Sequence, residues 1–250
     1  MAPGAVFLIG GGRNESALPH TYGRFVTALG GPPVSPIACV VLDDDDADQY
    51  VDRAITAFAA VGVGNVEPVF VSAERPLSAT DLHGAVGVFV SGGLTPGYHD
   101  AIVPVASEWL PWLRERGIPY AGYSAGAMIA PVQAIVGGWR LRRGDREVAI
   151  GAEEIGEDAE FLDVRPGLGL VPFAVEPHAS QWGTPTRLLH AVNAGLVPEG
   201  WAIDEDTMLE VRDGTITVHG LGSAYRVRQG GRSLTVDILG SGETVHGAVA

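Results

Sequence analysis

A series of short apolar runs restricts the fold of this sequence more than any other feature. Each run ends in a glycine-rich or acidic turn or is followed by a helical segment. Five such runs lie in the first half, at 6–9, 37–42, 66–71, 85–90 and 118–123. Runs that are this short and almost wholly apolar are typical of parallel strands covered on both faces. Segments with helical spacing lie between them, at 21–29, 48–60 and 101–116. The alternation predicts an α/β fold with a doubly wound, mostly parallel sheet flanked by helices.

The second half of the sequence predicts a β-rich C-terminal part. A polar, charged stretch at 139–163 favours loops and irregular strands, and the apolar run at 166–175 predicts another strand. A helix is expected at 186–192, and strands separated by turns follow, with a hairpin at Asp213-Gly214. Because no linker or repeat divides the chain, we expect one α/β domain over 1–250, with β-hairpins from about 200 to 250.

Composition restricts the classes of partner and compartment. The formal net charge of −14 lacks the basic surface that nucleic-acid phosphates require. The single cysteine, Cys39, excludes an internal disulfide and a cysteine-rich metal site, which fits a reducing compartment. The N-terminal stretch lacks the basic segment of a signal peptide, and no apolar run is long enough to span a membrane. We therefore expect a cytoplasmic protein without nucleic-acid or membrane partners, in which a homo-oligomer stays possible.

One serine lies between two glycines directly after the fifth apolar run, in the stretch GYSAGAMIA at 122–130. The pattern G-x-S-x-G between a strand and a helix holds a serine at the apex of a sharp turn with its hydroxyl exposed. The backbone N–H of Ala125, at the expected helix start, would then be available to an oxyanion. Small residues also allow a strand and a helix to pack closely. The pattern alone leaves both a nucleophilic and a structural role open for Ser124.

A serine nucleophile needs a base and an acid that orients the base. Among seven histidines, His178 follows a strand-like run, whereas the others are expected in loops, on helix surfaces or in hairpins. The acid is either Glu205, at a strand-to-turn junction, or a member of the acidic loop 153–158. Sequence spacing does not choose between them. The turn SGGLT at 91–95 could supply a second oxyanion donor from a glycine N–H.

Two further turns lack the residues that common ligand sites require. The stretch GGGRNE at 10–15 fails the dinucleotide fingerprint because its third glycine position holds Glu15. The four aspartates at 43–46 lack the alternating ligands and the glycine of a calcium loop, which indicates solvated charge. We therefore expect neither a cofactor nor a metal ion.

Taken together, these segments resemble the peptidase E and cyanophycinase family of serine peptidases, whose fold is similar to the flavodoxin-like fold of class I glutamine amidotransferases. The matching segments are GGG at 10–12, SGGLT at 91–95, GYSAGA at 122–127, PGLGLVPFAVEPHASQ at 166–181, RLL at 187–189 and AIDEDT at 202–207. The resemblance covers most of the chain. It implies that Ser124 is the nucleophile, that His178 is the general base, and that Glu205 orients the histidine.

The same resemblance implies an oxyanion hole and indicates where the substrate binds. The hole would be formed by a glycine of the Gly92-Gly93 pair together with Ala125. Members similar to cyanophycinase have arginines shortly after the histidine, which would pair with substrate carboxylates. Here Trp182 and Thr184 occupy such positions and only Arg187 remains, so Trp182 and Arg187 are the candidate substrate contacts. Leu94 also replaces a polar residue of the family pattern. These departures leave the preference for aspartyl dipeptides or β-aspartyl-arginine open.

The sequence therefore predicts a serine hydrolase that cleaves small peptides, isopeptides or related amides through an acyl-enzyme on Ser124. Two alternatives stay open. An esterase of the α/β-hydrolase type would need a base nearer the C-terminus, such as His219 or His246. A non-catalytic ligand-binding module on the same scaffold would need no base. Glutamine amidotransfer is disfavoured because its nucleophile is a cysteine, and Cys39 lies in the second predicted strand.

Overall fold

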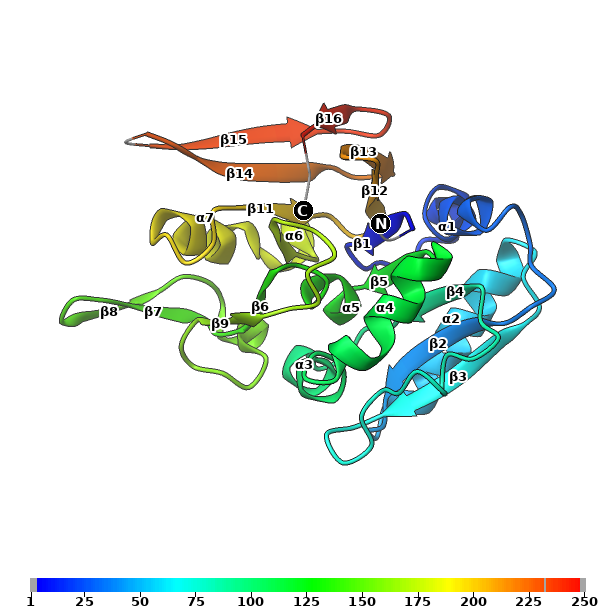
Figure 1. The fold of residues 1–250 in the computed structure, drawn as a ribbon. Coiled ribbons are helices and arrows are strands. Elements are labelled where there is room, and N and C mark those ends of the chain that lie inside the picture. Colours follow the sequence, from blue (N-terminus) through cyan, green and yellow to red (C-terminus); the bar gives the residue numbers. More distant parts are fainter. Residues whose placement is uncertain (1–3, 232, 248–250) are drawn as a thin grey trace.

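A central eight-stranded sheet organises the computed structural model, which describes residues 4–231 and 233–247 (Figure 1). The strand order is β16-β13-β12-β1-β5-β4-β2-β3, and the five strands from β1 to β3 in this order run parallel. These parallel strands are β1 (Val6–Ile9), β2 (Ile37–Leu42), β3 (Val66–Val71), β4 (Gly87–Val90) and β5 (Tyr120–Tyr123). They confirm the five strands predicted from the apolar runs.

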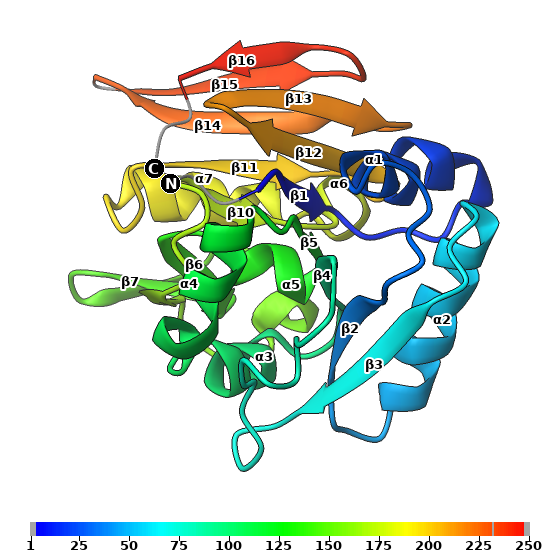
Figure 2. The same ribbon diagram turned by 45° about the vertical axis from the view of Figure 1, so that its right-hand side comes forward.

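Helices cover both faces of the parallel strands, as the doubly wound prediction requires (Figure 2). The helical elements are η1 (Glu15–His20), α1 (Tyr22–Ala28), α2 (Ala47–Ala60), α3 (Thr95–Ile102), α4 (Ala106–Arg116), α5 (Ala125–Met128), α6 (Ala179–Trp182) and α7 (Pro185–Asn193). Side chains alternate across a strand, so Phe7 and Ile9 of β1 pack with α1 and α2, while Val6 and Leu8 pack with α3 and α4. The sheet therefore separates two apolar cores.

Antiparallel strands extend the sheet beyond β1. They are β12 (Thr207–Arg212), β13 (Thr215–Gly220) and β16 (Thr244–His246), and β12 pairs directly with β1. The turn between β12 and β13 places Asp213 at φ 50° and Gly214 at φ 74°, as a two-residue hairpin of type I′ requires. This turn confirms the hairpin predicted at Asp213-Gly214.

A second sheet in the order β10-β11-β14-β15 lies beside these antiparallel strands, in the upper part of Figure 1. Its strands are β10 (Ala174–Glu176), β11 (Glu199–Ile203), β14 (Ala224–Gly230) and β15 (Ser233–Leu239), and only β10 and β11 are parallel. Two small antiparallel pairs and a 3-10 turn lie in and around the charged stretch 139–163. The strands β7 (Arg140–Arg143) and β8 (Arg146–Ala149) and the turn η2 (Glu153–Gly156) lie within it, and β6 (Gln133–Gly137) and β9 (Asp163–Pro166) flank it. The C-terminal part is thus β-rich, as predicted.

Two local predictions need correction, and the helix after Ser124 is short. The single helix expected at 101–116 is two helices, α3 and α4, because Pro104 lies between them and cannot continue a helical hydrogen-bond ladder. The run 166–175 is not one strand: Pro166 ends β9 and β10 begins at Ala174, while Leu168 and Leu170 between them donate their N–H groups to the segment after α5. The helix after Ser124 has four residues, and Pro131 soon follows it. Within the described residues, no helix has the length and apolarity to cross a membrane.

Candidate active site

Ser124 lies at the sharp turn between β5 and α5 in a strained backbone conformation. Its φ of 50° and ψ of −109° are rare for a residue with a side chain and cost about 1–3 kcal/mol. A Cβ on Gly122 would collide with the Gly126 carbonyl, and one on Gly126 would collide with the Val90 carbonyl. The two flanking glycines are therefore required by close backbone packing, while the serine itself stays at the apex.

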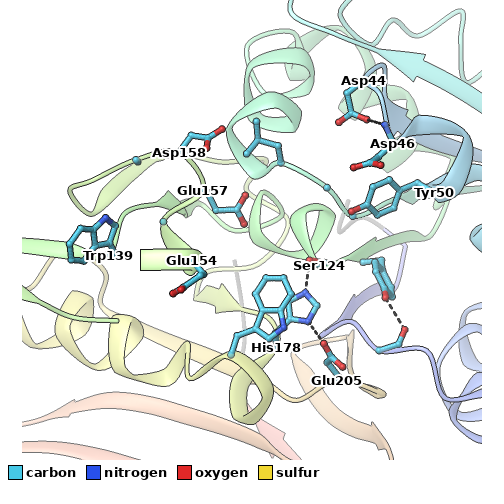
Figure 3. A pocket seen from close by; sticks show the side chains of 18 of the residues that line it. Asp44, Asp46, Tyr50, Ser124, Trp139, Glu154, Glu157, Asp158, His178 and Glu205 are labelled. Atoms are coloured by element: carbon cyan, nitrogen blue, oxygen red, sulfur yellow. Dashed lines mark hydrogen bonds and ion pairs between the residues drawn. The ribbon is translucent and has the colours of Figure 1, made fainter. Parts of the chain in front are cut away.

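Ser124, His178 and Glu205 form one hydrogen-bonded chain (Figure 3). The Ser124 Oγ lies 2.8 Å from His178 Nε2, and His178 Nδ1 lies 2.7 Å from Glu205 Oε1. Of the acids that the sequence left open, Glu205 is the one that contacts the imidazole. The arrangement has the geometry of a nucleophile, a base and an orienting carboxylate.

Parallel pairing explains why His178 and Glu205 meet although 27 positions separate them. In the register of β10 and β11, Glu176 lies opposite Ala202. His178 follows β10 by two residues and Glu205 follows β11 by two, so both lie beyond the carboxyl ends of neighbouring strands. Ligand sites in open α/β sheets occupy such ends.

The glycine turn after β1 joins all three segments through consecutive carbonyl groups. The N–H groups of Ser124, His178 and Asp206 donate to the carbonyls of Ile9, Gly10 and Gly11 over 3.0, 2.8 and 2.8 Å. A Cβ on Gly11 would collide with the imidazole of His178. The sequence of this turn excludes a dinucleotide site but does not indicate this role.

Three backbone N–H groups near the serine are the candidate oxyanion donors. Among the hydrogen bonds of the described residues, none uses the N–H of Gly92, Gly93 or Ala125. Gly92 and Gly93 line the same cleft as Ser124, and a Cβ on Gly92 would lie 3.3 Å from the Ser124 Cβ. With α5 only one turn long, the Ala125 N–H itself matters more than a helix dipole. The oxyanion hole stays a prediction.

Burial and the Glu205 carboxylate act in opposite directions on the pKa of His178. The residue is 7% exposed, and this burial lowers the pKa of the imidazole below its ordinary value, while Glu205 opposes the shift. The ring of Trp182 stacks on the imidazole with centroids 4.0 Å apart and planes 11° apart. A neutral imidazole near pH 7 is the form that can accept a proton from a serine hydroxyl.

The structure corrects the expected role of Arg187. Its guanidinium is buried, pairs with both carboxylate oxygens of Glu176 at 2.7 and 2.8 Å, and donates to the Ile155 carbonyl. It is not among the residues that line the cleft, because Glu176 holds it inside the protein. Thr184 is also buried, and its hydroxyl donates to the Pro177 carbonyl. Trp182, by contrast, is 51% exposed and lines the cleft, where substrate contact stays a prediction.

An open cleft of about 1110 Å³ surrounds the serine, and its lining is strongly acidic. The acidic residues that line it are Asp44, Asp46, Glu153, Glu154, Glu157, Asp158, Glu160 and Glu205, against the two basic residues Arg13 and Arg53. Figure 3 shows Asp44 and Asp46 on one side of Ser124 and Glu154, Glu157 and Asp158 on the other. The sequence pattern at 43–46 predicts only solvated charge for these aspartates. Their position after a parallel strand was the signal that could have placed them at the site.

Glu157 belongs to the acidic segment 153–160 that lines one side of the cleft, and it contacts the turn SGGLT at 91–95. Its carboxylate accepts the Thr95 N–H at 2.9 Å and the Thr95 hydroxyl at 3.1 Å. Burial raises the pKa of this carboxyl, although these hydrogen bonds oppose the shift. The loop expected to offer an alternative acid for His178 therefore binds the start of α3 instead.

The side chains required by the alternative mechanisms make other contacts. His219, on β13, has its Nε2 3.1 Å from Glu210 Oε2. His246, on β16, has its Nδ1 3.1 Å from the Thr215 hydroxyl. Cys39 is buried in β2, where burial raises the pKa of its thiol to about 12. Within the described ranges, no three His, Cys, Asp or Glu side chains are grouped so as to hold a metal ion.

The fold and the contact between Ser124 and His178 define an α/β protein with a serine–histidine pair at the carboxyl end of a parallel strand. The family model of peptidase family S51 matches residues 6–219. The chain therefore belongs to this family of peptidases, the peptidase E and cyanophycinase family. No curated protein sequence matches the chain significantly.

A solved structure supports the same fold. The crystal structure of a peptidase from an acI-B1 Actinobacterium is similar with a TM-score of 0.60, covering 98% of this chain and 97% of that one. The two sequences are 15% identical, so the similarity concerns the fold alone. It confirms the predicted α/β architecture.

Replacing Arg187 should destabilise the protein. Arg187→Met leaves the buried Glu176 carboxylate without its partner, so we expect the free energy of unfolding to fall by about 3–5 kcal/mol in urea titrations followed by circular dichroism. Arg228→Met is the matched control, because Arg228 pairs with Asp237 near the surface and should contribute less than about 1 kcal/mol. Wild-type stability in Arg187→Met would contradict the structural role.

Proposed function

We propose that the protein is a serine hydrolase that cleaves small peptides, isopeptides or related amides through an acyl-enzyme on Ser124. The observation that supports this most is the hydrogen-bonded chain from Ser124 Oγ through His178 to Glu205. Membership of a peptidase family supports it independently.

The proposed reaction has two halves. His178 Nε2 takes the proton of the Ser124 hydroxyl as Oγ attacks the substrate carbonyl carbon, and Glu205 stabilises the imidazolium through Nδ1–H. The carbonyl oxygen gathers negative charge against the N–H groups of Ala125 and a glycine of the Gly92-Gly93 pair. His178 then protonates the leaving amine as the C–N bond breaks. In the second half His178 takes a proton from water as the water oxygen attacks the acyl carbon. The bond between the acyl carbon and Ser124 Oγ then breaks, the acyl product leaves as a carboxylic acid, and His178 returns the proton to Oγ.

Covalent labelling tests the nucleophile. A fluorophosphonate should modify Ser124 in the folded wild-type protein, and mass spectrometry should locate the adduct. Ser124→Ala should lose both the label and hydrolysis of a dipeptide and isopeptide library, while Ser107→Ala, an exposed serine of α4 outside the cleft, should keep both. A folded wild type without an adduct would favour the binding module. Hydrolysis that survives Ser124→Ala would exclude the mechanism.

The pH profile should report the base. His178 must be neutral to accept a proton, and its pKa is lowered, so kcat/KM should stay constant down to a pH below about 6.5 before it falls. Glu205→Gln removes the group that raises this pKa, so the acid limb should move to lower pH while kcat falls by about 10³–10⁴. An unchanged profile in Glu205→Gln would contradict the assigned acid, and intact activity in His178→Gln would favour an esterase with another base.

The acidic cleft should select the charge of the substrate. We expect kcat/KM for peptides with lysine or arginine side chains to exceed that for matched aspartyl peptides by about tenfold or more at low salt, since clefts lined by one sign of charge concentrate the opposite charge. Asp158→Asn/Glu160→Gln should reduce this ratio, and added salt should reduce it too.

The control for this preference removes the same charge elsewhere. Glu108 and Glu115 are exposed on α4 and do not line the cleft, so Glu108→Gln/Glu115→Gln should leave the ratio unchanged. A preference for aspartyl peptides in the wild type would contradict this reading of the cleft.

A further inference from the structure

Asp204 is a buried carboxylate that the proposed mechanism does not use. It follows β11, directly before Glu205, and is 7% exposed. Its Oδ1 accepts the Ser180 N–H at 2.9 Å and the Ser180 hydroxyl at 2.6 Å, and its Oδ2 accepts the Ser223 N–H at 2.9 Å. Three donors satisfy this charge inside the protein, as burial of a carboxylate requires.

These hydrogen bonds join the segment that contains His178 to the segment that contains Glu205. Ser180 is the second residue after His178, and Asp204 is the neighbour of Glu205. The side chain of Gln181 adds a parallel contact, because its Oε1 accepts the Glu205 N–H at 3.0 Å. Packing leaves little freedom, since a Cβ on Gly222 would lie 2.7 Å from the Asp204 Cβ.

The backbone at His178 and the backbone after Glu205 both have conformations that need such contacts. His178 has a φ of 53°, and Asp206, directly after Glu205, has a φ of 58°. Residues with side chains keep these conformations only where the surroundings fix them. Helix α6 supplies little of this stability, because a helix of four residues is not stable alone.

We propose that Asp204 and Ser180 are positioning residues that hold the imidazole of His178 against the carboxylate of Glu205. This inference rests on the proposed function of the triad. Neither residue lines the cleft, so both act through the His178–Glu205 contact and not on the substrate. Their loss should slow turnover and disturb the protonation of His178 while leaving substrate binding intact.

Asp204→Asn is the first test. The amide group turns one of the two acceptor atoms into a donor, which then faces an N–H group of Ser180 or Ser223. We expect kcat to fall by about 10²-fold with KM within about twofold, because small misplacements of a catalytic group have effects of this size. The acid limb of the pH profile should also shift. In proton NMR the low-field resonance of His178 Nδ1–H, assigned by its loss in His178→Gln, should weaken or move.

Ser180 provides a second pair of variants that changes less of the protein. Ser180→Ala removes the hydroxyl, which contacts Asp204 and also the Tyr225 hydroxyl 3.0 Å away, and keeps the N–H contact with Asp204. We expect kcat to fall by about tenfold, since one hydrogen bond to a charged group contributes about 1.5 kcal/mol. Ser180→Thr restores the hydroxyl at this exposed position and should recover most of kcat and the NMR resonance. Asp237→Asn, on β15, removes one carboxylate elsewhere and should leave kcat and the resonance unchanged.

The outcomes separate this inference from the proposed function. Thermal unfolding identifies variants that fold, and if Asp204→Asn does not fold, the Ser180 pair decides. Folded variants with wild-type kcat, pH profile and NMR resonance would overturn the positioning role, even if their melting temperature falls. A raised KM at unchanged kcat would overturn it too. Failure of the proposed function appears instead in the wild type, as absence of a Ser124 adduct, while the resonance still reports the His178–Glu205 contact.

Discussion

Three consecutive carbonyl groups at the end of β1 are the constraint on which the site depends. The carbonyls of Ile9, Gly10 and Gly11 accept N–H groups from three distant segments, those of Ser124, His178 and Asp206. A side chain on Gly10 or Gly11 would collide with the β11–β12 turn or with the imidazole. One glycine turn thus fixes the relative positions of a serine on the parallel sheet, a histidine after β10 and a glutamate before β12.

The cleft combines two opposite electrostatic effects. Nearby carboxylates favour a charged imidazole, whereas burial favours a neutral one. Burial is the larger effect at His178, where Trp182 covers one face of the ring. Several of the acidic side chains, including Asp44, Asp46 and Asp158, are exposed, so solvent and salt weaken their effect on the base. Their charge therefore acts mainly on whatever enters the cleft.

Much of the fold was predictable because its signals are local. Buried parallel strands need apolar side chains on both faces, so the runs at β1 to β5 are visible in the sequence. The hairpin at Asp213-Gly214 was predictable because its turn type demands particular residues. The prediction of one helix at 101–116 was wrong because it followed the apolar spacing and did not take into account that Pro104 interrupts a helix. The predicted substrate contact of Arg187 was wrong because the sequence does not show that Glu176, eleven residues away, would hold it.

The sequence by itself determined the α/β class, the glycine-flanked serine and, by resemblance to a family, which histidine and which acid to test with it. Each is a matter of periodicity or of residues close together along the chain. Only the tertiary structure decided that Glu205 contacts His178, that Arg187 is buried, and that two acidic segments far apart in the sequence form the walls of one cleft. The reason is physical: these contacts depend on strand order and register, which bring the carboxyl ends of β1, β5, β10 and β11 together, and no short stretch of sequence encodes that pairing.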